Sequence, residues 1–183
     1  EEQKQRWLPD LAAGRALAGF GLTEPEAGSD AGGTRTTAKR EDGQWVIDGE
    51  KFVVLNGENA DTLIVTARTK GAQRDRSGIG VFIVPANAKG VTRKGYPTQD
   101  GGRAADITLA KVRVPDSARI GAEGAALPLI EKAVDRAIAA LCAEAVGAMD
   151  DQCVGRGDVE PAFDDRRRQE DVIFAVVEGA HPF

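Results

Sequence analysis

The chain has 183 residues, of which 42% are hydrophobic and 29% are charged, and its net charge is -5 at pH 7. This length is enough to bury a core, and the charge gives no basic field that would gather nucleic acid. No apolar run approaches the roughly 20 residues that a membrane-spanning helix needs, and the polar start is no signal peptide. We therefore expect a soluble, cytoplasmic protein with no membrane span and no nucleic-acid partner.

The first residues predict one or two short helical turns. Trp7, Leu8 and Leu11 recur at helical spacing within residues 2–14, but Pro9 interrupts the pattern. The chain opens without Met, in what resembles the middle of a helix, so we interpret it as a fragment that begins in a helical region.

A loop rich in glycine, from Gly21 to Gly33, follows these turns. Pro25 fixes one backbone dihedral, Gly28 permits a positive φ, and Thr23 and Ser29 place hydroxyls beside backbone N–H groups. This combination suits a segment that holds a polar ligand against its backbone. A plain solvated turn has the same composition, so both interpretations stay open.

Residues 35–114 predict short β-strands without intervening helices. Asp42-Gly43 and Asp48-Gly49 are two successive hairpin signals, and residues 71–78 predict a solvated loop. The expected strands are Arg35–Glu41, Gln44–Asp48, Lys51–Asn56, Thr62–Arg68, Gly80–Val84 and Ile107–Val114. This pattern favours a mainly β domain, an antiparallel barrel or two orthogonal sheets, flanked by helical segments.

Residues 125–149 predict one long helix with a broad apolar face, which implies a partner helix. The segment 151–183 continues no obvious element, and its arginine run 166–168 is typical of a solvated face. Cys142, Cys153 and the single His181 form no metal-ligand pattern, so we expect neither a metal site nor a serine–histidine triad.

Three motifs at matching spacing resemble the flavin-dependent acyl-CoA dehydrogenase family. Residues 21–30, Gly-Leu-Thr-Glu-Pro-Glu-Ala-Gly-Ser-Asp, match the family's first signature, and 48–57 look like its second flavin segment. Residues 112–124 look like its exit from the β domain. The resemblance implies a fragment of a three-domain fold, with the divisions 1–17 (end of the N-terminal helical domain), 18–117 (middle β domain), 118–150 (first C-terminal helix) and 151–183 (atypical tail).

The same resemblance implies FAD as cofactor and oxidation of an acyl-CoA thioester to trans-2-enoyl-CoA. By direct match, the cofactor-contact positions are Phe20, Leu22, Thr23, Gly28 and Ser29, and Ser29 also borders the acyl-CoA substrate. The backbone N–H groups of residues 22 and 23 are expected at the isoalloxazine edge of the flavin. An electron-transfer flavoprotein is implied as partner, and we expect a homo- or hetero-oligomer.

Two positions depart from the family pattern. Val53 and Leu55 stand where the family has a tryptophan that covers the flavin and a threonine that hydrogen-bonds near N5; we keep both as cofactor-binding positions. They alternate on one strand face, so plain core or cofactor packing is the alternative role. No catalytic residue is identified, because Ala137 falls where a minority of the family carry the base and cannot act as one.

The sequence leaves three hypotheses open. The chain is either the FAD- and acyl-CoA-binding middle domain of an acyl-CoA dehydrogenase, incomplete and inactive alone, or a non-catalytic subunit of a heteromeric enzyme. Residues 51–110 look most like the small subunit of the pimeloyl-CoA branch of the family, which favours the second. The third hypothesis is that 151–183 is a frame-altered or truncated end.

Overall fold

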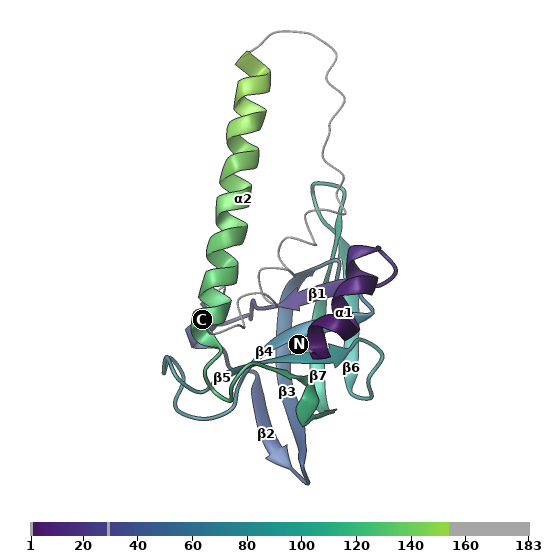
Figure 1. The fold of residues 1–183 in the computed structure, drawn as a ribbon, viewed down its shortest axis with the longest axis vertical. Coiled ribbons are helices and arrows are strands. Elements are labelled where there is room, and N and C mark those ends of the chain that lie inside the picture. Colours follow the sequence, from purple (N-terminus) through teal and green to yellow (C-terminus); the bar gives the residue numbers. More distant parts are fainter. Residues whose placement is uncertain (1, 29, 154–183) are drawn as a thin grey trace. The chain divides into compact units, whose positions relative to one another are not determined.

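The structure is a computed structural model that describes residues 2–28 and 30–153 (Figure 1). In chain order the elements are α1 Glu2–Ala12, β1 Ala18–Gly21, the 3-10 turn η1 Ala31–Gly33, β2 Thr37–Glu41, β3 Gln44–Leu55, β4 Thr62–Arg68, β5 Ile79–Pro85, β6 Val91–Pro97, β7 Arg103–Pro115, the 3-10 turn η2 Asp116–Ala118, β8 Arg119–Ile120 and α2 Leu127–Cys153. They fall into two compact units, Glu1–Pro128 and Leu129–Phe183. The β-strands all belong to the first.

The strands form one sheet in the order β6-β7-β3-β2-β4-β5-β8, with β1 paired to β4 outside this path (Figure 1). The predicted mainly β fold is confirmed. Most neighbours run antiparallel, but β1 runs parallel to β4 over four residue pairs, and β2 makes one parallel pair with β4, Thr37 with Arg68. The sheet is therefore mixed rather than purely antiparallel.

The core lies between the inward faces of β3, β4, β5 and β7. Every residue of β4 is buried, and β7 alternates between buried and exposed positions along most of its length. Trp45 and Phe82 stack at 5.2 Å between ring centroids, a tilted arrangement typical of aromatic pairs. Core packing thus fixes the strands that carry the loop 22–34.

The first predicted hairpin is confirmed, but the second is wrong. Asp42 and Gly43 both have positive φ, as a tight hairpin turn between β2 and β3 requires. At Asp48-Gly49 the chain does not turn: β3 continues from Gln44 to Leu55, with a register shift after Ile47. A Cβ at Gly49 would lie 2.6 Å from Thr36 Cα, so this glycine serves close strand contact rather than reversal.

Three further elements, α1, β6 and α2, differ from the sequence predictions. The first helix is longer than expected, because α1 runs through Pro9 and ends only three residues later, at Ala12. Strand β6 was not predicted, since its residues are polar and largely exposed and so lack alternation. Helix α2 begins and ends later than 125–149.

No helix in the described ranges is both long and apolar enough to cross a membrane. The predictions for 154–183, including the arginine run, concern residues outside the described ones.

Candidate functional site

The loop that leaves β1 is held by its own backbone. Glu24 N donates to Gly28 O at 3.0 Å and Gly28 N donates to Glu24 O at 2.9 Å, which closes a tight turn around Pro25. Gly28 takes a φ of +57°, a conformation that favours glycine. Farther along, the Asp30 carboxylate accepts from Gly32 N at 2.9 Å and begins η1. These hydrogen bonds give the loop a defined backbone conformation.

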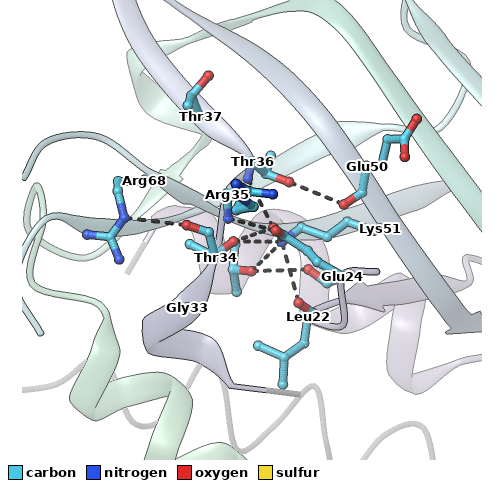
Figure 2. A network of polar contacts seen from close by, with 12 residues as sticks. Leu22, Glu24, Gly33, Thr34, Arg35, Thr36, Thr37, Glu50, Lys51 and Arg68 are labelled. Atoms are coloured by element: carbon cyan, nitrogen blue, oxygen red, sulfur yellow. Dashed lines mark hydrogen bonds and ion pairs between the residues drawn. The ribbon is translucent and has the colours of Figure 1, made fainter. Parts of the chain in front are cut away.

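A buried cluster of polar side chains lies under this loop (Figure 2). Lys51 is fully buried, and its Nζ donates to Glu24 Oε1 at 2.6 Å, Thr66 Oγ1 at 2.8 Å and Thr34 Oγ1 at 3.1 Å. The same Nζ lies 3.5 Å from the carbonyl oxygen of Leu22. Because an ammonium has three N–H donors, Lys51 is fully satisfied inside the protein.

The Glu24 carboxylate completes this cluster from the loop side. Besides Lys51 it accepts from the Thr34 hydroxyl, from Arg35 N at 2.6 Å and from Thr36 N at 3.1 Å (Figure 2). Burial alone would raise the pKa of Glu24, but Lys51 and these hydrogen bonds lower it to about 2. Burial lowers the pKa of Lys51 to about 8, against the opposing attraction of Glu24. At neutral pH the cluster is an ion pair, and Glu24 is a poor proton acceptor.

A second buried cation, Arg68, ties the far end of the loop to the segment after β4. Its guanidinium donates to Gly32 O at 2.7 Å and contacts Thr34 O at 3.4 Å. It also reaches the carbonyls of Asp75 and Ser77 at 3.3 Å. One side chain thus fixes the backbone of two loops.

Strand β3 meets the loop where the strand is irregular. Phe52 N donates to Thr23 O at 2.8 Å. Between Lys51 and Val54 the pairing with β7 shifts register, and Val53 takes a φ of +52°, which is rare for a β-branched residue. Asp106 Oδ1, which also accepts from the Tyr96 hydroxyl at 3.0 Å, lies 3.4 Å from Val53 N.

This bulge leaves apolar side chains on the surface. Val53 is 52% exposed and Leu55 is 66% exposed, and no other large hydrophobic side chain described before Pro128 is exposed to this degree. The plain core role considered for both residues is therefore wrong. An apolar pair beside a glycine-rich loop is typical of a ligand surface.

The described segment from Gly21 to Glu24 adds hydrogen-bond donors to this surface. Within the described ranges, the N–H groups of Leu22 and Thr23 donate to no protein acceptor, although both residues are half-buried. Backbone donors in such positions usually find a partner, so a ligand acceptor fits them.

Comparison with known proteins places this surface in a family. The family described as acyl-CoA dehydrogenase, middle domain, matches residues 19–113, which include the loop, the cluster and the bulge. The chain belongs to the acyl-CoA dehydrogenase family. The short-chain specific acyl-CoA dehydrogenase of Clostridium acetobutylicum is 37% identical over 153 residues, which cover 80% of this chain and 39% of that relative. The chain therefore spans well under half the length of this relative.

Two solved structures share the fold. A glutaryl-CoA dehydrogenase from Mycobacterium smegmatis in complex with FADH2 is 40% identical with a TM-score of 0.63, over 71% of this chain and 33% of that one. The ChsE4–ChsE5 complex from Mycobacterium tuberculosis contains a chain that is 33% identical with a TM-score of 0.68, over 74% of this chain and 35% of that one.

The acyl-CoA dehydrogenase fold brings some of the predicted site residues together. Leu22 and Thr23 lie against β3 beside the bulge that exposes Val53. Phe20 is half-buried in β1, opposite Ile64 of β4, and Gly28 is exposed across the turn. Ser29 lies outside the described residues. No group of three or more histidine, cysteine, aspartate or glutamate side chains able to hold a metal occurs in the described part of the chain.

Sequence reasoning missed the buried cluster of Glu24, Thr34, Lys51 and Thr66. One signal for it was present: a lysine that continues a strand whose earlier residues, Trp45 to Ile47, are apolar. Its partner carboxylate is 27 residues away, in a loop whose path a single sequence does not give.

Proposed function

We propose that this chain is the middle β domain of a flavin-dependent acyl-CoA dehydrogenase and forms one wall of its FAD site. The observation that carries the proposal is that two N–H donors, at residues 22 and 23, have no protein acceptor among the described residues and lie on the same strand-and-loop surface as the exposed apolar side chains of Val53 and Leu55. Flavin is a planar heteroaromatic ring with an apolar face and a polar edge, so this surface fits it. Family membership supports the same cofactor.

In this proposal, backbone donors and apolar side chains contact different parts of the cofactor. The N–H groups of Leu22 and Thr23 hold acceptor atoms at the flavin edge, while Val53 and Leu55 pack against apolar cofactor surface and exclude water. Phe20, Gly28 and Ser29 complete the contact, the last also toward acyl-CoA. When bound, FAD supplies the hydride acceptor for oxidation of the thioester to its trans-2-enoyl form. The general base is not among the residues we assign.

Flavin binding by the purified full-length protein tests the proposal. We expect yellow flavin absorbance that bleaches when an acyl-CoA is added without an electron acceptor. Leu55→Asp, which places a charge on the apolar surface, should weaken FAD binding at least tenfold. Thr92→Asp, which places the same charge at an exposed strand position on β6, is the matched control and should not. A protein that binds no flavin under any loading condition would refute the proposal.

A second candidate is a non-catalytic subunit of a heteromeric acyl-CoA dehydrogenase, as in the pimeloyl-CoA branch. It is favoured by the absence of a hydroxyl at Leu55 and of a carboxylate at Ala137. That a two-protein complex is among the similar structures is consistent with it. Co-purification decides between the two: normal turnover by the protein alone, with an electron-transfer flavoprotein as acceptor, would rule out the non-catalytic role.

A further inference from the structure

Three consecutive carbonyl groups in the segment 21–23 are held on the protein side. Gly21 pairs in parallel with Val65, which turns Gly21 O toward β4, and the Thr66 hydroxyl also donates to this oxygen at 3.4 Å. Lys51 Nζ lies 3.5 Å from Leu22 O, and Phe52 N donates to Thr23 O at 2.8 Å. The Thr66 contact is a long hydrogen bond. Because the three N–H groups of Lys51 already donate to Glu24, Thr34 and Thr66, its contact with Leu22 O is an ion–dipole attraction, and both side chains are completely buried. The carbonyls of Gly21 and Leu22 therefore face the cluster that Figure 2 shows.

The direction of a carbonyl fixes the direction of the next N–H. In a planar trans peptide the C=O and N–H bonds point to opposite sides. With Gly21 O turned toward Thr66, the N–H of Leu22 points away from the cluster. With Leu22 O turned toward Lys51, the N–H of Thr23 does the same. These are the two donors that have no protein acceptor in the described ranges.

We propose that Lys51 and the hydroxyl of Thr66 are positioning residues that act together with the β1–β4 pairing to aim the N–H groups of Leu22 and Thr23 at the bound cofactor. Glu24 and Thr34 hold the ammonium in place, so the donors are fixed before a ligand arrives and little reorganisation accompanies binding. The identity of the ligand rests on the function proposed above, whereas the orientation of the two peptides does not.

Thr66 allows the sharpest test, because its hydroxyl is the link from Lys51 to Gly21 O. Thr66→Val removes this hydroxyl at nearly constant volume, and Thr66→Ser keeps it. Thr62→Val is the matched control: Thr62 is a buried threonine on the same strand that takes no part in the cluster. We would measure FAD affinity and the flavin absorption spectrum of each variant of the full-length protein, and the backbone amide NMR shifts of the apoprotein.

We expect Thr66→Val to weaken FAD binding about 5- to 10-fold, the loss typical of a disturbed hydrogen bond, and to alter the flavin spectrum. It should also shift the amide resonances of Leu22 and Thr23. Thr66→Ser and Thr62→Val should stay within about twofold of the natural protein. Should Thr66→Val not fold, Thr66→Ala takes its place with the same expected result.

Two outcomes would overturn the inference: equal FAD affinities and spectra for Thr66→Val and Thr62→Val, or unchanged amide resonances at residues 22 and 23. If the natural protein binds no FAD, the proposed function fails instead. The amide resonances of the apoprotein then still decide whether Thr66 orients these peptides.

Discussion

The two halves of strand β3 differ in the side chains that they bury and expose. From Trp45 to Ile47 the strand turns apolar residues into the core. From Lys51 to Leu55 it buries an ammonium and one apolar side chain, Val54, and exposes Val53 and Leu55. The first half is scaffold, stabilised by burial of apolar area. The second half departs from this pattern by means of a bulge and a carboxylate, Glu24, and in the proposed function it lies at the cofactor site.

The largest expected effect on stability comes from removing the buried ammonium of Lys51, in the second half of β3. Lys51→Met leaves the Glu24 carboxylate buried without its cation, so we expect the free energy of unfolding to fall by about 3–5 kcal/mol. Chemical denaturation measures this. The double variant Glu24→Gln/Lys51→Met removes both charges and should recover most of the loss. If the double variant is as unstable as the single one, the cost does not come from an unpaired charge.

The pH dependence sharpens the same comparison. Because the folded pKa of Glu24 lies at about 2, below its ordinary 4.5, its contribution is complete above pH 4.5 and lost as the pH falls toward 2. The shift corresponds to about 3 kcal/mol. Glu24→Gln should therefore flatten the acid limb of stability against pH by about this amount, and an unchanged limb would contradict the assignment. The pKa of Lys51 is lowered from 10.5 to about 8 by burial. The free energy of unfolding should therefore rise as the pH increases from about 8 to 10.5.

A smaller effect on the free energy of unfolding is expected in the first half of β3. Ile47 is completely buried in the core, so Ile47→Val should lower the free energy of unfolding by about 0.5–1.5 kcal/mol. Since Ile47 lies away from the loop, FAD affinity should stay within twofold. A large loss of affinity in this variant would show that the two halves of β3 are not separable.

The smallest effect on stability belongs to the exposed apolar pair. Leu55 is 66% exposed, so Leu55→Ser should change the free energy of unfolding of the apoprotein by less than about 0.5 kcal/mol. In the proposed function, the same variant weakens FAD binding. Thermal melts with and without FAD separate the two effects, and a destabilised apoprotein would mean that Leu55 supports the fold instead.

Local signals explain what could be predicted from the sequence. The turn at Asp42-Gly43 and strand β4 follow from residues that are neighbours in the chain. The behaviour of Gly49 depends on Thr36, the residue just before the paired strand β2, and strand β6 has no apolar alternation to reveal it.

The site shows the same limit. The family motif predicted the loop and the positions of Val53 and Leu55. It did not predict that a bulge expels them from the core, because the bulge depends on the register of β3 against β7.

The hydrogen bonds of Arg68 connect the glycine-rich loop to an exposed segment where a probe can be attached outside the candidate site. The residues from Gly71 to Ser77 are exposed, yet their backbone is joined through one guanidinium to the carbonyl of Gly32. A fluorophore on a cysteine introduced at Arg74, with Cys142 and Cys153 replaced by serine, would lie in this exposed segment. Its anisotropy would report a change in the order of the two connected loops when FAD is added.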